Sequence, residues 1–471
     1  MKTTCSILIF LLVSTFPAHA AWKAAAAKAV ITPDKPLWMA GYASRKTGAT
    51  GKLHDLFAKA LVLQDDAGAR VAIITLDLIG VPKPLRVTVA AEAQARFKLP
   101  PSHLLLNASH THCGPMIRVV RPVGQRKHAL AAYDAIPLNQ RERRVRETLE
   151  YNTRLQNTLI DLIGRCIKNL QPAKLGYSHA RCGFAMNRRL PVNGGFRNSP
   201  NPAGPVDHEV PVLQVRGADG KLCGILFGYA CHNTSTGVMQ FNGDYAGFAQ
   251  EYLEAENPDA VALFVTGCGA DQNPYPRGTI DLAKRHGRTL ATAVEAGLIA
   301  NPKPLAGSLR AALEYVDIDY ATPPTRAQLE AKAKSPNRYD RRHAETLLEV
   351  LNAKGTLPKS YPVPVQVIHL GDTLTMVTIG GEVVVDYSLR LKRELGKNRA
   401  VWVAGYSNDV MAYIPSRRVL REGGYEGGGA MRYTRSTPHP GPWAESIEQR
   451  LVNAIIRSDR RLLNMGMGVN N

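Results

Sequence analysis

The segment LLLNASHTHCGPM, residues 104–116, places an apolar run directly before a cluster of small and polar side chains. Its three leucines predict a buried strand, and Gly114 with Pro115 marks the turn that follows. His110 and His112 stand two residues apart, so in an extended chain both imidazoles point to the same face. This segment alone leaves two interpretations open: a hydrogen-bonded structural pair at the end of a strand, or two groups that share one functional pocket.

The rest of the chain alternates short apolar stretches with longer amphipathic ones, which predicts a mixed, multi-layer α/β domain with strands buried between helices. The predicted strands are 70–80, 103–109, 210–217, 223–231, 260–269, 363–372, 374–381 and 400–408, and the predicted helices are 84–97, 142–169, 244–256, 279–298 and 383–395. The stretch 320–362 is polar and helical with prolines at its edges, and we interpret it as an insertion or lid. We expect one domain at 21–471.

The first twenty residues, MKTTCSILIFLLVSTFPAHA, have a basic start, an apolar centre and an Ala-His-Ala end. This pattern (1–20) is typical of a secretory signal peptide, with cleavage after Ala20. Cys5 stands too early to be a lipid-attachment cysteine. No later segment is apolar for long enough to span a bilayer. We therefore predict an exported protein, periplasmic or secreted, that is soluble after cleavage.

The composition is strongly basic, with a formal net charge of +20 and a pI of about 9.7. In an exported protein this charge favours an anionic membrane or envelope surface, or an acidic substrate, as the partner. The basic runs at 141–147 and 457–461 lack interleaved aromatic residues, so we interpret them as solvated helix faces and expect no nucleic-acid binding. The six cysteines after residue 20 are scattered without a CxxC pair, and we expect most of them to be buried thiols.

Polar side chains follow several of the predicted strands. His232, Glu382 and Tyr413 each come after a different apolar stretch. Ligands of α/β sheets bind at the carboxyl ends of strands, so we expect these side chains to gather there with His110. Imidazole, carboxylate and phenol groups suit a catalytic Zn²⁺ ion, which takes N and O ligands and keeps room for water. No HExxH motif is present, so the spacing by itself does not identify the site.

Seven motifs stand in order along residues 30–430: GYASRKTGATGKLHDLFAKALVLQD, NASHTHCGP, MNRRLP, VDHEVPVLQV with GILFGYACHNTS, NGDYAGFAQ, GGEVVVDYSLRL and YSNDVMAYIPSRRVLREGGYEGG. Together they resemble the motif series of the neutral/alkaline (non-lysosomal) ceramidase family. The resemblance implies the catalytic fold of that family and the hydrolysis of an N-acyl, ceramide-like amide by a zinc-activated water.

The resemblance also implies roles for individual residues. Four residues match the family's zinc ligands: His110, His232, Glu382 and Tyr413. Three match groups that face the substrate carbonyl or stand beside the metal: His112, Arg188 and Tyr425. Such groups stabilise an oxyanion or protonate a departing amine. His54 and Asp244 match motif positions too, and we interpret both as structural.

Each site residue also has a structural interpretation. His110 could be a strand-end histidine, and Glu382 could be a carboxylate at a helix N-terminus, stabilised by the helix dipole. Arg188 could form a surface salt bridge. Tyr425 could simply pack within its Gly-rich loop.

The sequence departs from the family pattern at three places. Asn273 stands where the family carries a serine, so a covalent serine mechanism has no nucleophile at this position. The segment VLREGGYEGGGAMRY (419–433) is more Gly-rich and basic than its family counterpart, so the amine half of the substrate can differ from sphingosine. The chain ends at residue 471, without room for the C-terminal immunoglobulin-like domain that we expect in this family.

Three functions remain open at this stage. The first is an exported zinc-dependent amidohydrolase that cleaves a linear, ceramide-like N-acyl amide. The second keeps the metal site but acts on another amide or an ester, such as a sugar or peptide conjugate. The third is a non-catalytic protein that binds anionic envelope polymers through its basic surface. The sequence does not specify the acyl chain, the amine half, the metal ion or the oligomeric state.

Overall fold

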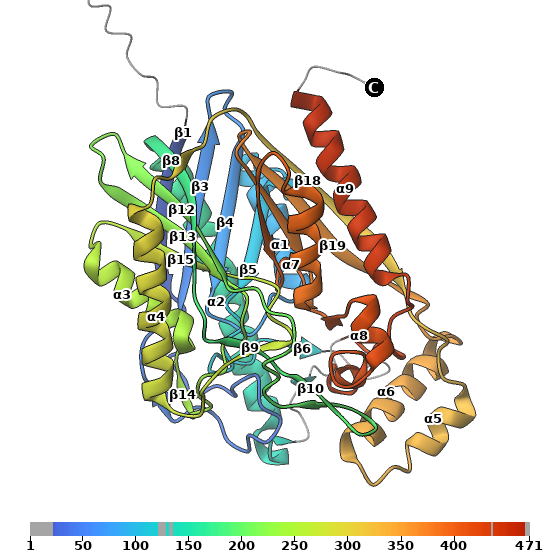
Figure 1. Cartoon of the computed structure of the whole chain (residues 1–471). Helices are drawn as coiled ribbons and strands as arrows, with labels where there is room; N and C mark the ends of the chain where they lie inside the picture. Colours follow the sequence, from blue (N-terminus) through green and yellow to red (C-terminus); the bar gives the residue numbers. More distant parts are fainter. Residues whose placement is uncertain (1–21, 121–128, 131–134, 435–436, 467–471) are drawn as a thin grey trace, which may run out of the picture.

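The computed structural model describes residues 22–120, 129–130, 135–434 and 437–466. The predicted signal peptide, with Cys5, lies outside these residues. Within them, two large β-sheets pack face to face between two layers of helices (Figure 1). This arrangement confirms the predicted mixed, multi-layer α/β fold.

The larger sheet has nine strands of mixed direction. In spatial order they are β15 (Val261–Thr266), β13 (Leu222–Tyr229), β12 (Glu209–Gly217), β8 (Gln171–Arg181), β1 (Trp22–Val30), β3 (Phe57–Asp65), β4 (Arg70–Leu76) and β5 (Leu104–Ala108), with β17 (Lys303–Pro304) paired to β8. The pairs β13–β15 and β4–β5 are parallel, and the other pairs of this sheet are antiparallel.

The smaller sheet has four strands, in the order β18 (Leu309–Asp319), β19 (Ser360–Leu370), β20 (Leu374–Ile379) and β22 (Ala400–Ala404). The first three are antiparallel, and β20 and β22 are parallel. Ile368, Met376 and Trp402 of this sheet share one apolar core with Leu226 and Leu263 of the larger sheet. Strands buried on both faces read as continuous apolar runs, which is why strands such as β4, β13 and β20 were predicted from the sequence.

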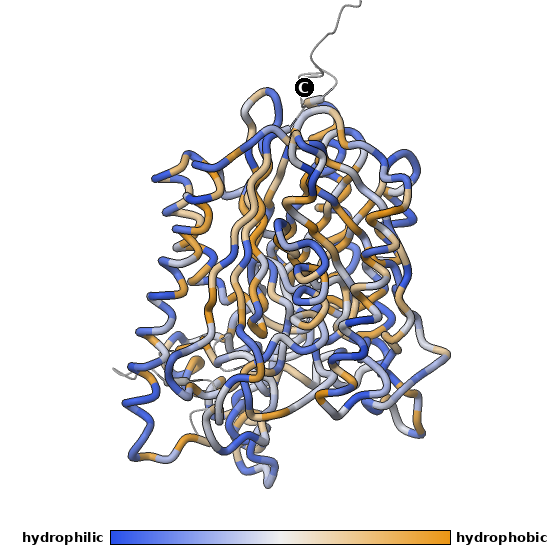
Figure 2. Tube along the Cα trace, turned by 90° about the vertical axis from the view of Figure 1, so that its left-hand side faces the viewer, coloured by the Kyte–Doolittle hydropathy of each residue, from blue (hydrophilic) through white to orange (hydrophobic). Residues whose placement is uncertain are grey.

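Helices cover the outer faces of both sheets (Figure 1). The larger sheet is covered by α1 (Lys83–Phe97), α2 (Arg141–Lys168), α3 (Asp244–Glu256) and α4 (Ile280–Ile299), and the smaller by α7 (Val385–Leu395) and α9 (Ile447–Gly466). Figure 2 shows apolar positions gathered along the central strands and hydrophilic ones on the outer helices and loops. No helix of the described residues is long and apolar enough to cross a membrane.

The segment 320–362 contains the predicted helices of the insertion, α5 (Arg326–Lys332) and α6 (Arg338–Lys354). The pair has a small hydrophobic core of its own. Helix α6 packs against the 3₁₀ helix η4 (Gly429–Tyr433). The insertion therefore lies beside the Gly-rich segment that carries Tyr425.

Short strand pairs and helical turns make up the rest of the described elements. The pairs are β2 (Gly51–Lys52) with β14 (Gln240–Phe241), β6 (Val119–Val120) with β7 (Ala129–Leu130), β9 (Ala185–Asn187) with β16 (Gln272–Pro274), β10 (Arg189–Val192) with β11 (Gly195–Asn198), and β21 (Glu382–Val383) with β23 (Tyr413–Ile414). The turns are α8 (Arg417–Glu422), η1 (Pro101–His103) and η3 (Leu138–Gln140).

Four long strands, β1, β3, β8 and β18, lie outside the strand ranges predicted from the apolar runs. Strand β1 reads WKAAAAKAV, and alanine by itself favours a helix. It is a strand because it pairs with β3 along its whole length and with β8 at its start, so tertiary pairing overrides local propensity. The six cysteines of the described residues are free, and five are buried, which confirms the expectation of buried thiols.

Candidate metal centre

The carboxyl ends of β5, β15 and β22 meet at one buried side chain, that of Asn107. Its Oδ1 accepts a hydrogen bond from Thr266 N at 2.9 Å, and its Nδ2 donates to Gly405 O at 2.9 Å. This amide therefore ties both edges of the nine-stranded sheet to one end of the four-stranded sheet. The residues that follow these strand ends are brought to one place, as expected for ligand sites in α/β sheets.

His110 follows β5 in a left-handed backbone conformation, with φ of +62°. Its backbone N–H donates to Leu78 O at 2.9 Å, and its ring Nδ1–H donates to Ile79 O at 2.6 Å. This conformation costs a non-glycine residue about 1 kcal/mol, which the surrounding bonds offset. Because a carbonyl oxygen only accepts, Nδ1 carries a proton, and in the neutral ring Nε2 has the lone pair.

His232, after β13, is held in the same way. Its Nδ1–H donates to Gly269 O at 2.7 Å, so Nε2 again carries the lone pair. Burial, followed by the charge of Arg188, lowers the pKa of His232 to about 3. The ring is therefore neutral at physiological pH, as a metal-binding imidazole must be.

The loop that follows His232 is fixed by the two residues that we interpreted as structural. The Asp244 carboxylate accepts backbone hydrogen bonds from Ser235 N and Thr236 N, each at 3.0 Å. His54 Nε2 accepts a hydrogen bond at 2.7 Å from the backbone N–H of the residue before Asp244. Both side chains hold the backbone, and their contacts are those of structural residues.

Glu382 and Tyr413 come from the side of the four-stranded sheet and are partners in the parallel pair β21–β23. Glu382 Oε2 lies 3.3 Å from His110 Nε2 and 3.4 Å from His232 Nε2. Tyr413 Oη lies 3.4 Å from the same His232 nitrogen. Helix α7 begins only at Val385, so the Glu382 carboxylate contacts the histidines instead of capping that helix.

Two imidazole lone pairs and a carboxylate oxygen therefore converge at this site. Glu382 Oε2 is buried and accepts no hydrogen bond. Three acceptor atoms at such distances repel one another, and a shared cation turns the repulsion into attraction. Imidazole nitrogen, carboxylate oxygen and phenol oxygen form a donor set that fits Zn²⁺.

His112 completes a cluster of three imidazoles. Its Nε2 lies 3.2 Å from His110 Nε2, and the ring nitrogens of His110, His112 and His232 lie within 4.8 Å of one another, close enough to hold a metal ion together. Gly41 packs so closely against the His112 ring that a Cβ at position 41 would lie 2.5 Å from a ring atom. Unlike the other two rings, His112 has an Nδ1 that is buried without a hydrogen-bond partner.

Arg188 is buried beside Tyr413, with 4% of its surface exposed. Its guanidinium donates to Tyr413 Oη at 2.9 Å, to Glu426 Oε1 at 2.9 Å and to Asn273 Oδ1 at 3.3 Å. The alternative of a surface salt bridge is therefore wrong, since the ion pair with Glu426 is buried. The Asn273 side chain helps to orient Arg188.

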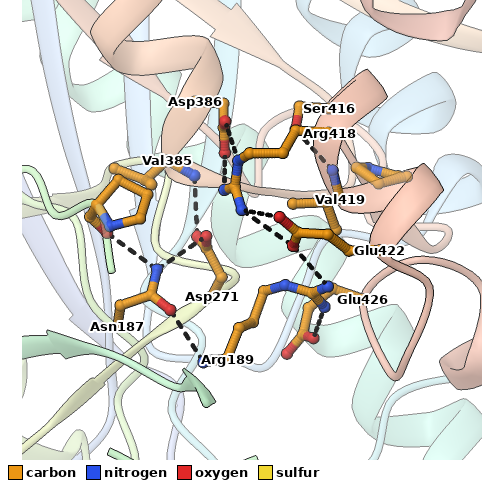
Figure 3. A network of polar contacts seen from close by, with 12 residues as sticks. Asn187, Arg189, Asp271, Val385, Asp386, Ser416, Arg418, Val419, Glu422 and Glu426 are labelled. Atoms are coloured by element: carbon orange, nitrogen blue, oxygen red, sulfur yellow. Dashed lines mark hydrogen bonds and ion pairs between the residues drawn. The ribbon is translucent and has the colours of Figure 1, made fainter. Parts of the chain in front are cut away.

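A chain of alternating charges runs outward from Glu426 (Figure 3). Glu426 accepts a hydrogen bond from Arg189 at 2.6 Å, and Arg189 donates to Glu422 at 3.1 Å. Arg418 then bridges Glu422 and Asp386, each at 2.8 Å. The chain ties β10, α8 and the first turn of α7 together around the site.

Asp271 connects two further elements that lie beside the site (Figure 3). Its carboxylate accepts hydrogen bonds from Val385 N at 2.9 Å and from Asn187 Nδ2 at 3.3 Å. Burial, together with nearby carboxylates, raises the pKa of Asp271 to about 7. The residue connects β9 with the start of α7, the two elements next to Arg188 and Glu382.

Tyr425 stands at the mouth of the site, with 41% of its surface exposed. Its ring centroid lies 5.3 Å from that of Tyr413. A cavity of about 110 Å³ opens beside Glu382. The described residues that line it are Arg118, Glu382, Val410, Met411, Ala412, Tyr413, Tyr425, Ala430, Tyr433 and Thr434. Tyr425 therefore faces a cavity, in addition to packing within its loop.

Sequence reasoning missed three residues that build the site. Asn107 lies inside the segment 104–116, Glu426 directly follows Tyr425, and Asp271 lies in GADQNP. The available signal was a polar residue next to a buried apolar run or a candidate site residue, since buried polar groups need partners. The partners themselves lie far away in the sequence, so this signal could not name them.

The fold and the cluster together define a mixed α/β protein with a candidate metal site where two sheets meet. No protein-family model and no curated protein matches the sequence. Among solved structures, neutral ceramidase from Pseudomonas aeruginosa is similar, with a TM-score of 0.68 and 20% sequence identity, covering 93% of this chain and 75% of that one. A ceramidase complexed with C2 is similar too, with a TM-score of 0.68, 19% identity, and 93% and 76% of the two chains covered. The chain therefore has the fold of a neutral ceramidase.

Proposed function

We propose that this protein is a metal-dependent amidohydrolase that cleaves an N-acyl amide with water. The observation that carries the proposal is the convergence of two imidazole lone pairs and the Glu382 carboxylate beside a cavity. The likeness of the fold to neutral ceramidase supports it. A linear, ceramide-like amide is the first substrate class to test.

The ligands of the metal in this proposal are His110, His232, Glu382 and Tyr413, and Zn²⁺ is the ion that best suits them. When bound, this ion supplies polarisation of a carbonyl and a water of lowered pKa. His110 and His232 present Nε2 in a fixed orientation, because each Nδ1–H is bonded to a backbone carbonyl.

Three other side chains stabilise developing charge or transfer protons. Arg188 donates N–H bonds toward the developing oxyanion, and Tyr425 Oη donates from the side of the cavity. His112 Nε2 accepts a proton from the attacking water and returns it to the departing amine. This proposal needs no serine nucleophile, and Asn273 instead holds the Arg188 guanidinium at 3.3 Å.

A second assignment of the same site has specific support. The ring nitrogens of His110, His112 and His232 lie within 4.8 Å of one another, so His112 is a possible third nitrogen ligand. Metal-binding histidines are usually oriented by a hydrogen bond from their second ring nitrogen, and His112 lacks one, which favours its role as an acid–base group. The variant His112→Ala separates the two assignments, because metal content falls only if His112 is a ligand.

We also propose that the protein acts outside the cytoplasm. The signal-like first twenty residues and the net charge of +20 support this location and an approach to an anionic membrane or envelope surface. Three functions compete with this proposal: hydrolysis of a different amide, hydrolysis of an ester, and non-catalytic binding to the envelope. The experiment below separates them.

The first experiment measures the metal content of the purified protein and its hydrolysis of a short-chain ceramide, an N-acyl amino sugar and an acyl ester. We expect about one zinc ion per chain in the wild type and none in His110→Ala or Glu382→Ala. His179→Ala, which removes an exposed histidine on β8, is the matched control and should keep the metal. Failure of the wild type to bind metal, even after zinc is supplied, would overturn the proposal and favour a binding role.

A further inference from the structure

Four tyrosines, which we name the tyrosine wall, run in a row from the candidate metal centre to the helical insertion: Tyr413, Tyr425, Tyr433 and Tyr339. The centroids of successive rings are 5.3, 6.1 and 4.8 Å apart. The two middle rings, Tyr425 and Tyr433, expose 41% and 39% of their surface. Successive rings are inclined at 70°, 47° and 63°, so none of them stacks face to face on its neighbour.

Arginines hold both ends of the tyrosine wall. At the inner end, the Arg188 guanidinium lies 5.8 Å and 5.9 Å from the ring centroids of Tyr413 and Tyr425. At the outer end, the Arg338 guanidinium lies 4.7 Å from the ring centroid of Tyr339. Such cation–π contacts favour one orientation of each ring.

The outer part of the wall is joined by polar contacts to the Gly-rich segment and to the backbone at His439. Arg432, on η4, forms an ion pair with Asp340 of α6 at 3.1 Å. His343 of α6 donates from Nε2–H to His439 O at 2.7 Å. The rings of the two elements are therefore held in place before a ligand arrives, which lowers the entropic cost of binding.

The cavity at the inner end of the wall is small, and its lining combines polar and apolar side chains. Its volume is about 110 Å³. Polar groups of Arg118, Glu382, Thr434 and three tyrosines line it, together with the aliphatic side chains of Val410, Met411, Ala412 and Ala430. A short acyl group is suited to such a space, whereas a long alkyl chain is better suited to an extended apolar groove. Beyond the cavity, an alkyl chain would also cover phenol and guanidinium groups without bonding to them, which is unfavourable.

We propose that the tyrosine wall binds the amine half of the substrate and that this half is a sugar, so that the substrate is an N-acetylated amino sugar within a glycan. Sugar rings pack their C–H faces on aromatic rings, and their hydroxyls bond to phenol oxygens and guanidinium N–H groups. Water adds across the C–N bond, which yields acetate and a free amino sugar. The inference rests on the proposed function, because it assigns the substrate class of the same site.

The test uses N-acetylchitotetraose and N-acetylsphingosine as probes of the metal-loaded full chain. Acetate release gives kcat and KM, and calorimetry gives Kd for the oligosaccharide. We expect Tyr433→Ala and Tyr339→Ala to raise KM and Kd for the oligosaccharide about tenfold with little change in kcat. Tyr433→Phe keeps the ring and should restore most of the binding.

The matched control is Tyr252→Ala. Tyr252 lies on α3 with the Arg288 guanidinium 5.5 Å from its ring centroid. Figure 1 shows α3 and α4 on the opposite side of the molecule from α5 and α6. This variant removes a similar tyrosine–arginine contact and should leave both KM and Kd unchanged.

The two possible failures are distinguishable. Oligosaccharide binding that depends on the wall, without hydrolysis of any amide, supports the subsite and overturns the amidohydrolase. Hydrolysis of N-acetylsphingosine that Tyr433→Ala and Tyr339→Ala leave unchanged, without binding of the oligosaccharide, overturns the sugar and keeps the amidohydrolase. A wild type that neither binds nor hydrolyses the oligosaccharide overturns this inference whatever its action on ceramide.

Discussion

The nine-stranded sheet and the four-stranded sheet contribute to one site in different ways. On the first side, His110 and His232 are each fixed by an Nδ1–H bond to a backbone carbonyl, at 2.6 and 2.7 Å. On the second side, Tyr413 is fixed by Arg188, which depends in turn on the buried carboxylate of Glu426. The histidine half therefore relies on backbone geometry, and the phenol half relies on a balance of buried charges.

Removal of a histidine should break the site most severely. We expect His232→Ala to lose the metal and to lower kcat/KM by more than about 1,000-fold, because one of the fixed nitrogen donors is removed. Elemental analysis and steady-state kinetics on the same preparation check this outcome. A variant that keeps both metal and activity would show that His232 is not part of the site.

Removal of the arginine should separate the two halves. Arg188→Met is expected to keep the metal and to lower kcat about 100- to 1,000-fold, because an oxyanion donor is lost. Arg188→Lys keeps the charge but not the planar fork that reaches Tyr413, Glu426 and Asn273, so intermediate activity is expected. Loss of metal in Arg188→Met would mean that the two halves are not independent.

The charge balance itself is tested by Glu426→Gln, which leaves two buried arginines with less compensating charge. We expect the free energy of unfolding to fall by about 3 kcal/mol, measured by urea denaturation. Glu394→Gln weakens the partly exposed pair with Arg390 and is the control, with an expected loss below about 1 kcal/mol. Equal losses in the two variants would contradict the special role of the buried carboxylate.

A buried histidine away from the metal centre, His439, should change its contribution to stability in acid. His439 Nδ1 accepts a hydrogen bond from Tyr320 Oη at 2.6 Å, and its Nε2–H donates to Met411 O at 3.3 Å. Burial lowers its pKa from the usual 6.5 to about 3. Since the unfolded chain takes up the proton first, this contribution to stability is complete above pH 6.5 and is lost as the pH falls toward 3.

The variant His439→Gln should therefore flatten this part of the stability profile. Free energies of unfolding of wild type and variant, measured at intervals across this pH range, provide the comparison. The difference between the two proteins should shrink as the pH falls. A constant difference would contradict the assignment of a neutral, buried His439.

The element predictions succeeded where the local signal was strong and failed where pairing decides. The apolar run before His110 is strand β5, and the amphipathic stretch 244–256 is helix α3. Strand β1 was not predicted, because its alanines carry no strand signal until β3 lies beside them. The polar insertion at 320–362 was predicted as helical, but its position beside η4 follows from packing alone.

The sequence by itself determined the residue types that follow the buried strands, and so the kind of chemistry to expect from His110, His232 and Glu382. Only the tertiary structure decided that the side chains of these three residues converge, that Arg188 is buried, and that Asn107 joins three strand ends. The physical reason is that apolar periodicity acts between near neighbours, whereas a buried polar contact can join residues from any two parts of the chain.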